Sequence, residues 1–371
     1  MIHDFPRYQH AMTSSGTTPP KADTRAQEGN WLPENLAQIS DTLAQLANQT
    51  FAAKPVAIFD FDNTCIFRDI GQALFRFQLQ HLRYRISPDE LAAILPPEQG
   101  TLAERPVAAI RTTILSVYKK LWPLIQSGQT ELARQTPEYP LFATLLLWCT
   151  DMARKAEHLG PRYVLPFMGK MLAGFTTNEL HQLAREVVCQ VEMEPLVEEI
   201  LEIEAPQPIG RISASYPLGL HAYPEMQALM RQLAAQGIER YVISASTEWL
   251  VEGAAPRLGF AVDPDHIYGI RVRLTAEERL TIDDYPAYPT TYREGKAEII
   301  TQRIKGTPVL VAGDADTDYE MLTLPDVPIR LLINRRQSGL IASLYQQPGI
   351  LLQGVDLTKG CFRPSRDSVS A

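Results

Sequence analysis

The sequence predicts an α/β protein with a doubly wound parallel sheet and a large all-α insertion. Three observations carry this prediction. Short apolar runs, such as 56–59 and 308–312, alternate with helical patterns. These runs end in hydroxyl or acidic residues. In such a sheet, ligands bind at the carboxyl ends of the strands, which is where these residues would lie. A long block of helical periodicity, from about 71 to 215, interrupts the alternation.

The first elements lead into the sheet. Residues 1–30 are rich in polar residues and proline, and we expect a flexible N-terminal arm there. A helix with one apolar face is expected over about 31–48. The run 56–59 then reads as a buried strand, and it ends in Asp60 and Asp62.

The block after the first strand is helical throughout, with breaks at proline and glycine. It has no clear internal repeat. The expected helices cover about 69–86, 88–95, 104–127, 130–136, 139–158, 164–173, 176–191 and 194–203. An all-α insertion of this length is typical of a separate cap domain, which we expect to set specificity.

The alternation of strands and helices resumes after Pro224, which suits the first position of a helix. The segment 267–280 has the alternation of a hairpin or of edge strands. The remaining expected strands are 240–244, 308–313 and 329–334, and the remaining helices are 224–235, 247–258 and 294–304.

Length and composition fit two domains. The 371 residues are many for one compact core, and 45% apolar with 21% charged residues is ordinary for a globular protein. The net charge of -8 argues against nucleic acid or an anionic membrane as the main partner. No apolar run is long enough to span a bilayer, and because residues 1–30 contain no apolar stretch we do not expect them to be a secretory signal. The four scattered cysteines fit reduced thiols, so we expect a cytoplasmic location.

These observations divide the chain into four parts. The N-terminal arm is 1–30, and the α/β core comprises 31–70 and 216–355. The helical cap is 71–215, and the C-terminal tail is 356–371. The oligomeric state is not readable from the sequence.

Asp60 and Asp62 are the first candidate site residues. Alternation along an extended chain sends both carboxyl groups to one side. Two like charges this close resist ionising together unless a cation joins them or one keeps a proton. A divalent metal, or a nucleophile with its own acid/base, would satisfy that arrangement. Taken alone, the pair also fits a solvated loop or incidental calcium ligation.

Three later features supply what such a site would lack. Ser244 lies at the end of a second apolar strand, and Ser246 is the expected cap of the helix that follows. Lys296 stands at the start of a helical pattern. Asp314 and Asp318 form an acidic loop after a third apolar strand. The carboxyl ends of parallel strands meet at one edge of the sheet, so we expect these residues to converge.

The four features, in this order, resemble the motifs of the haloacid-dehalogenase-like superfamily of phosphohydrolases. The resemblance implies a Rossmann-like core with a C1-type cap. It makes Asp60 the nucleophile that forms an aspartyl-phosphate and Asp62 the general acid and base. Ser244 would bind a phosphoryl oxygen, and Lys296 would pair with the phosphoryl group and Asp60.

The resemblance also implies a Mg²⁺ site. Asp314 would ligate the ion together with an Asp60 oxygen and the backbone carbonyl of Asp62. Asp318 would ligate directly or through water. Magnesium prefers oxygen ligands, which this set supplies. We expect Asp316, between them, to form a turn or face solvent.

We therefore expect a Mg²⁺-dependent phosphomonoesterase that hydrolyses a small phosphorylated metabolite. The alternatives are a phosphotransferase of the same superfamily, and a regulatory or binding protein on the inherited fold. The inserted cap resembles that of phosphoserine phosphatases, and the segments 31–48, 60–71 and 223–249 resemble phosphorylcholine-phosphatase-like proteins. Aromatic residues of the cap would suit a quaternary amine if they lined a pocket, but aromatics at helical spacing more often form core.

Overall fold

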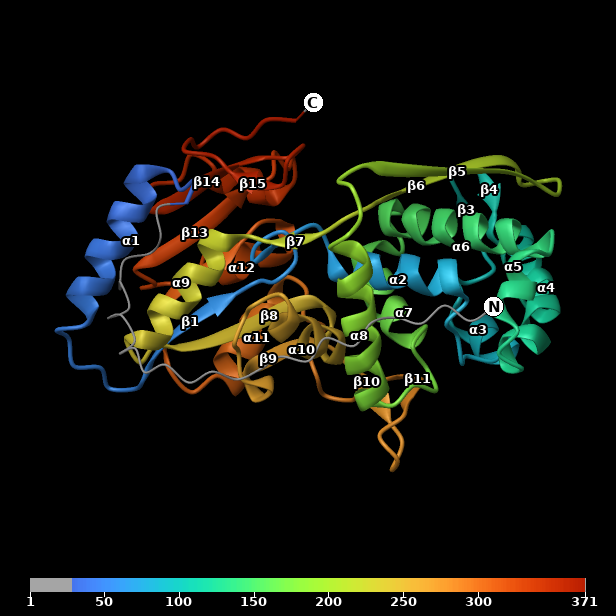
Figure 1. The fold of residues 1–371 in the computed structure, drawn as a ribbon, viewed down its shortest axis with the longest axis horizontal. Coiled ribbons are helices and arrows are strands. Elements are labelled where there is room, and N and C mark those ends of the chain that lie inside the picture. Colours follow the sequence, from blue (N-terminus) through green and yellow to red (C-terminus); the bar gives the residue numbers. More distant parts are fainter. Residues whose placement is uncertain (1–28, 371) are drawn as a thin grey trace, which may run out of the picture.

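The computed structural model describes residues 29–370, which form two lobes (Figure 1). One lobe is built around a central sheet, and the other consists mostly of helices from the middle of the chain. The flexible arm expected over 1–30 lies almost wholly outside the described residues.

A seven-stranded sheet forms the centre of the first lobe. In spatial order its strands are β15 (Cys361–Phe362), β14 (Ile350–Asp356), β13 (Ile329–Asn334), β12 (Thr307–Gly313), β1 (Pro55–Phe59), β8 (Glu239–Thr247) and β9 (Ile267–Ile270). All neighbours pair in parallel except β14 and β15. The chain begins with β1 in the middle, adds β8 and β9 on one side, and then fills the other side. The order therefore switches direction between β1 and β12, where doubly wound sheets bind their ligands.

Helices cover both faces of the sheet. One face packs against α1 (Pro33–Leu46), α9 (Pro224–Ala235) and α10 (Glu248–Arg257), and the other against α11 (Glu294–Arg303) and α12 (Tyr319–Leu322). Alternation along β1 sends Ala57 and Phe59 to the first face, and Val56 and Ile58 to the second. The predicted fold class, α/β with a doubly wound parallel sheet, is confirmed.

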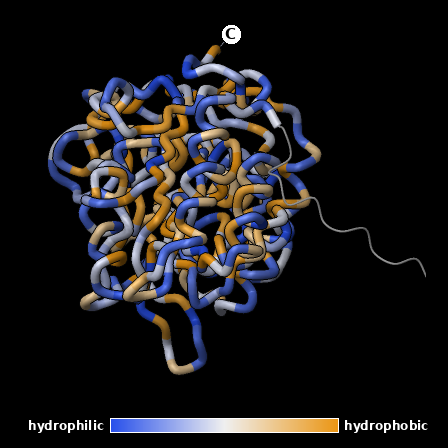
Figure 2. The backbone as a smooth tube through the Cα atoms, turned by 90° about the vertical axis from the view of Figure 1, so that its left-hand side faces the viewer, coloured by the Kyte–Doolittle hydropathy of each residue, from blue (hydrophilic) through white to orange (hydrophobic). Residues whose placement is uncertain are grey.

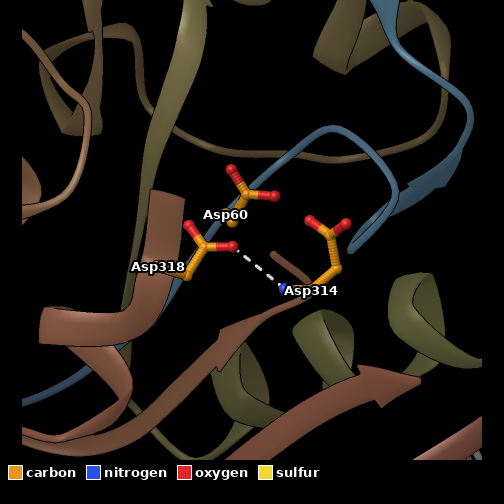
Figure 3. Close-up of side chains that lie close together, drawn as sticks. All are labelled: Asp60, Asp314 and Asp318. Atoms are coloured by element: carbon orange, nitrogen blue, oxygen red, sulfur yellow. Dashed lines mark hydrogen bonds between the residues drawn. The ribbon is translucent and has the colours of Figure 1, made fainter. Parts of the chain in front are cut away.

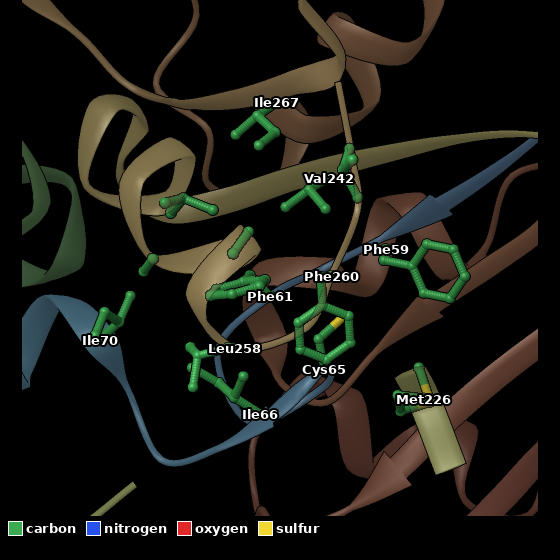
Figure 4. Close-up of a cluster of buried hydrophobic side chains, with 14 of the residues drawn as sticks. Phe59, Phe61, Cys65, Ile66, Ile70, Met226, Val242, Leu258, Phe260 and Ile267 are labelled. Atoms are coloured by element: carbon green, nitrogen blue, oxygen red, sulfur yellow. The ribbon is translucent and has the colours of Figure 1, made fainter. Parts of the chain in front are cut away.

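Hydrophobic packing fixes the loop that follows β1. Hydrophobic segments run through the interior of the folded molecule, and hydrophilic segments lie mostly at its periphery (Figure 2). Phe61 meets Phe260 edge to face with centroids 5.8 Å apart, and Cys65, Ile66 and Ile70 belong to the same cluster (Figure 4). Cys65 thus acts as a small buried hydrophobe, as expected. The backbone beside Asp60 and Asp62 is anchored on both sides.

The second lobe is the inserted segment, and it has a hydrophobic core of its own. The helices expected there occur, apart from the last one. They are α2 (Ile70–His81), α3 (Pro88–Ile94), α4 (Val107–Gln126), α5 (Thr130–Arg134), α6 (Glu138–Lys155), α7 (Gly160–Lys170) and α8 (Thr177–Val191). Within residues 29–370, no helix combines the length and the apolar character needed to cross a bilayer.

The insertion is not all-α, and the helix expected over 194–203 is wrong. That segment begins a hairpin of β5 (Glu198–Ala205) and β6 (Gly210–Pro217), and β3 (Thr101–Leu102) pairs with β4 (Arg105–Pro106). Leu201 and Ile203 alternate with glutamates and pack on the core of the insertion. Together with Ile200, these residues also match the spacing of a helix. The sequence is therefore compatible with a helix and with a strand, and tertiary packing favours the strand.

One inserted helix packs directly on the α/β lobe. Gly253 of α10 leaves no room for a Cβ, which would lie 2.8 Å from the Cα of His181 in α8. The ring of His181 lies 2.7 Å from the carboxylate of Glu252, also across this contact. The inner residues of α8 share the larger hydrophobic cluster of the sheet. The two lobes are therefore joined by packed side chains as well as by their two connecting segments.

Part of the C-terminal tail expected over 356–371 belongs to the sheet. β15 pairs antiparallel with β14, and Phe362 is buried against Trp31 and Tyr223 at 5.1 and 4.6 Å between centroids. The segment is too short and polar to show strand periodicity by itself. The edge strands expected over 267–280 occur as β9 and as β10 (Val272–Leu274), which pairs with β11 (Leu280–Asp284). β2 (Ile66–Phe67) pairs with β7 (His221–Ala222) where the chain passes between the lobes.

Candidate active site

The acidic pair sits at the carboxyl end of β1. The backbone N–H of Asp60 donates to the carbonyl of Ala312 at 2.9 Å, which continues the pairing with β12. The chain then turns at Asn63, whose φ of 61° lies in the left-handed region that asparagine tolerates. Both carboxyl groups are buried, with Asp60 3% and Asp62 9% exposed.

Lys296 binds Asp60 as predicted. Its Nζ lies 2.6 Å from Asp60 Oδ1 and 2.6 Å from Asp318 Oδ1, and the lysine is fully buried. Burial alone lowers the pKa of Lys296, but the charges of Asp318 and Asp60 outweigh it and raise the pKa overall. The ammonium is therefore held charged between two carboxylates. Gly295 lets α11 start there, since a Cβ would collide with the carbonyl of Thr290.

Thr64 is a site residue that the motif comparison did not single out. Its hydroxyl lies 2.9 Å from Asp60 Oδ2 and 3.4 Å from Asp314 Oδ1. Each oxygen of Asp60 thus has a donor, Lys296 on one side and Thr64 on the other. The available signal was position alone, four residues after Asp60 in the same turn.

Asp62 is held by three donors. The hydroxyls of Ser244 and Ser246 donate to its Oδ2 at 3.1 and 2.7 Å, and the N–H of Ile70 donates to Oδ1 at 2.7 Å. Burial raises the pKa of Asp62 to about 8, assisted by the charge of Asp69 and opposed by these hydrogen bonds. A carboxyl group with this pKa can carry a proton at neutral pH.

The structure corrects the expectation for Ser246. Thr247 holds the N-cap position of α10 and makes no side-chain cap, while the Ser246 hydroxyl points to Asp62. Ser246 is therefore part of the site. Ser244 is in the expected place, but its hydroxyl is engaged by Asp62, so its role toward a phosphoryl oxygen stays a prediction.

The acidic loop after β12 brings in Asp314 and Asp318 (Figure 3). Oδ2 of Asp318 accepts the N–H of Asp314 at 2.9 Å and that of Ala315 at 3.3 Å. A Cβ at Gly313 would lie 2.5 Å from Cβ of Asp318, so the tight turn requires glycine. Oδ1 of Asp318 takes Lys296 and the Thr317 hydroxyl. Each carboxylate oxygen of Asp318 thus accepts two hydrogen bonds, and these bonds hold the loop to Lys296.

Arg335 is a second residue that sequence reasoning missed. Its guanidinium donates to Asp314 Oδ2 at 2.7 Å. Burial lowers the pKa of Arg335, but Asp314 more than offsets this and raises it. The only sequence signal was its place directly after the predicted strand 329–334.

The acidic cluster fits a divalent metal ion. Carboxylate oxygens of Asp60, Asp314 and Asp318 lie within 4.8 Å of one another. With Asp62, four buried carboxyl groups face two cations, Lys296 and Arg335. When all four are ionised, their negative charge exceeds the positive charge of the two cations. Burial disfavours the ionised form further and raises the pKa values of Asp60 and Asp314. An all-oxygen donor set of this kind suits magnesium.

Asp316 behaves as a turn-forming residue, as expected. Its Oδ1 accepts the N–H of Ile341 at 2.7 Å, at the start of a 3₁₀ turn, Leu340–Leu344. A Cβ at Gly339 would lie 2.2 Å from its other oxygen, so the carboxylate is packed against that turn.

A cavity of about 410 Å³ opens beside the acids, between the two lobes. Asp60, Asp62 and Asp314 line it from the core. The insertion contributes residues of α2, α6 and α7, among them Leu74, Phe75, Gln78, Arg154, Leu165 and Met168. The catalytic candidates thus face a space that the inserted lobe helps to shape.

The cap aromatics form core, as the more common interpretation held. Among the aromatic residues of the insertion, only Phe75 lines the cavity. Tyr118 stacks on Phe142 with centroids 5.1 Å apart, and Tyr84 packs edge to face on both. These rings stabilise the inserted lobe and do not form a cation–π cage at the site.

Comparison with known proteins supports the fold. No family model and no curated protein matches the sequence. The crystal structure of a conserved, functionally unknown protein from Anaerococcus prevotii matches with a TM-score of 0.83 and 25% identity, over 94% of this chain and 99% of that one. The two proteins therefore share their fold, including the insertion, over nearly the full length of each chain.

Two further similarities are more remote. A protein of unknown function from Bordetella pertussis has a TM-score of 0.44 and 14% identity, over 82% of this chain and 100% of its own. A phosphoserine phosphohydrolase-like protein from Francisella tularensis has a TM-score of 0.34 and 12% identity, over 76% and 87%. Similarity at this level carries no functional argument.

Proposed function

We propose that this protein is a Mg²⁺-dependent phosphomonoesterase of the haloacid-dehalogenase-like superfamily, acting on a small phosphorylated metabolite. One observation carries the proposal. Asp60, held between Lys296 and Thr64, faces the same cavity as Asp62, whose pKa is raised by burial to about 8. A carboxylate nucleophile beside a carboxylic acid is what two-step ester hydrolysis requires.

Asp60 is the proposed nucleophile. One of its oxygens forms a bond to phosphorus as the ester P–O bond breaks, which leaves an aspartyl-phosphate and an alcohol. Lys296 and Thr64 fix the direction of the carboxylate, and this positioning lowers the entropic cost of attack. The Lys296 charge also counters the negative charge of the phosphoryl group.

Asp62 is the proposed proton carrier. It gives its proton to the departing alkoxide, and it takes a proton from the water that then attacks the phosphorus of the aspartyl-phosphate. Ser244, Ser246 and the N–H of Ile70 hold its carboxyl group in one orientation through both steps. The second step releases inorganic phosphate and regenerates the Asp60 carboxylate.

Asp60 and Asp314 are the proposed direct ligands of Mg²⁺, with the backbone carbonyl of Asp62 as the superfamily pattern implies. When bound, the ion supplies positive charge to the phosphoryl oxygens. Both oxygens of Asp318 already accept two hydrogen bonds each. We therefore assign Asp318 to holding Lys296 and the acidic loop, with contact to the ion through water.

Hydrolysis of p-nitrophenyl phosphate by the purified chain with Mg²⁺ tests this function. Release of p-nitrophenol and phosphate in equal amounts supports a hydrolase. Release that requires an added alcohol indicates a phosphotransferase, and no turnover with any phosphomonoester indicates a binding protein.

We further propose a cytoplasmic location, because all four cysteines are free.

Asp62→Asn is expected to lower kcat by about 10²–10⁴-fold on alkyl phosphates, because an amide neither gives nor takes the proton. The loss in the first step should be smaller for p-nitrophenyl phosphate, whose leaving group needs little protonation. Single-turnover kinetics on both esters measures this. An Asp62→Asn protein that hydrolyses alkyl phosphates at the parental rate would exclude the proposed role.

Removal of metal is expected to abolish activity. After EDTA treatment and dialysis, turnover should return with Mg²⁺ and not with Ca²⁺, whose longer and more flexible coordination would displace the Asp60 oxygen. Asp314→Ala should not recover activity at any Mg²⁺ concentration tested. Full activity of the EDTA-treated protein would contradict a metal site here.

A further inference from the structure

Two guanidinium groups, Arg335 and Arg154, line the active-site cavity, and they differ in their partners. Arg335 is neutralised by Asp314 at 2.7 Å. Arg154, near the end of α6, contacts the sulfur of Met168 at 3.5 Å, and it forms no ion pair with any carboxylate in residues 29–370. A half-buried guanidinium without an anionic partner leaves hydrogen-bonding capacity turned toward the cavity.

Arg154 is also the only charged side chain that the inserted segment 70–217 places on the cavity. The other lining residues of this segment are apolar or uncharged, among them Leu165 and Met168, and Asp69, directly before α2, also lines the cavity. Three other cations of the insertion are engaged elsewhere. Arg111 donates to backbone carbonyls, Lys120 pairs with a glutamate at 3.0 Å, and Lys170 pairs with an aspartate at 2.8 Å.

We propose that Arg154 binds a second anionic group of the substrate, so that the enzyme acts on phosphomonoesters that carry another carboxylate or phosphoryl group. This inference rests on the proposed function. A guanidinium binds either anion with two parallel N–H···O bonds, which fixes the orientation of the group as well as its charge. The low polarity around Leu165 and Met168 strengthens such a pair.

The charge distribution of the cavity sets the direction of the substrate. Five acidic residues line the cavity, namely Asp60, Asp62, Asp69, Asp314 and Asp316, and their ionised carboxyl groups repel an anion that is not paired with a cation. Arg154 lies on the insertion side and attracts one. A substrate with an anion at each end therefore enters with its ester at Asp60 and its second anion at Arg154. A quaternary amine at the second position would meet a like charge.

Binding of inert phosphonates tests the inference without depending on turnover. Isothermal titration calorimetry with Mg²⁺ compares phosphonobutanoate with phosphonobutanamide, which has the same shape without the second charge. The carboxylate should bind the parent protein about tenfold or more tightly than the amide. Arg154→Gln should reduce this ratio to about one, and Arg154→Lys should give an intermediate ratio because it keeps only the charge.

Lys155→Gln is the matched control. Lys155 follows Arg154 in α6, is 66% exposed, and pairs with Asp151 at 2.7 Å. Its replacement removes the same charge outside the cavity and should keep the parental ratio. Propylene bisphosphonate, run in parallel, shows whether a phosphoryl group or a carboxylate is the preferred second anion.

The inference is overturned if neither doubly anionic phosphonate binds better than the amide, or if the preference survives in Arg154→Gln. Failure of the hydrolase proposal has a different signature. In that case p-nitrophenyl phosphate is not hydrolysed, while the Arg154-dependent preference for doubly charged phosphonates persists.

Discussion

Asp60→Asn is expected to reduce turnover by about 10⁴-fold or more, because the amide cannot form the bond to phosphorus. The protein should still fold. The substituted side chain can present its amide oxygen to Lys296 and its NH₂ to the Thr64 hydroxyl, so both contacts survive. Steady-state kinetics with p-nitrophenyl phosphate and a thermal unfolding curve measure the two effects separately.

The burial of Asp60 makes this prediction more specific. Desolvation, with the nearby Asp318 charge, raises the pKa of Asp60, so removal of its charge relieves repulsion in the metal-free cluster. The melting temperature without Mg²⁺ should therefore be kept or raised. Asp41→Asn, the same change at an exposed position of α1, should leave activity at the parental level. An active Asp60→Asn protein would exclude Asp60 as the nucleophile.

Lys296→Met is expected to have the largest effect on stability. It removes the only cation that bonds to Asp60 and Asp318 within residues 29–370, and it leaves both carboxylates buried. Breaking one side of a buried ion pair typically costs about 3–5 kcal/mol of the free energy of unfolding. Urea unfolding without metal should show a loss of this order, and Mg²⁺ should restore part of it. Turnover should fall by about 10²-fold or more, since the carboxylate loses its orientation.

The pH dependence of Lys296→Met follows from the Asp60 carboxyl group. Burial already raises its pKa in the folded protein, and loss of the lysine charge, which lowers that pKa, raises it further above the unfolded value. The native state then binds more protons than the unfolded state, so its stability rises as the pH falls. The deficit relative to the parent protein should therefore shrink as the pH falls toward the raised pKa that Asp60 already has in the parent.

Lys305→Met, at an exposed lysine just beyond α11, is the matched control for this variant. It removes a lysine charge without touching a buried carboxylate, so we expect parental stability and turnover. A Lys296→Met protein as stable as this control would contradict the assigned ion pairs.

The parts of the site that lie at strand ends were predictable from the sequence. β1 and β12 are short apolar runs that end in acids, and parallel pairing brings Asp60 and Asp314 to one edge of the sheet. Lys296 lies at the start of α11 and reaches Asp60 and Asp318 there. Local apolar periodicity and the topology of a doubly wound sheet suffice to bring these residues together.

The contacts that complete the site depend on tertiary packing, and the sequence did not reveal them. Thr64, Arg335 and Ser246 act through one or two side-chain hydrogen bonds, whose partners lie elsewhere in the chain or across a turn. Arg154 lines the cavity, whereas Lys155 beside it faces outward. Only the packing of α6 determines which of these two neighbouring cations reaches the cavity.

Two elements of the fold were missed for similar reasons. The β5–β6 hairpin has apolar residues that satisfy a helical and a strand period at once. β15 spans two residues, and its position depends on burial of Phe362 against Trp31 and Tyr223. Short strands of this kind derive their stability from neighbours that are distant in sequence.

The proposed mechanism transfers the phosphoryl group of the substrate to Asp60. Acid quenching during turnover, followed by peptide mass spectrometry, tests it directly. A phosphorylated peptide containing Phe59 to Cys65 is expected, modified at Asp60, which borohydride reduces to homoserine at that position. The Asp60→Asn protein should give no such peptide. A phosphoryl group found on another residue of an enzyme in active turnover would contradict the account.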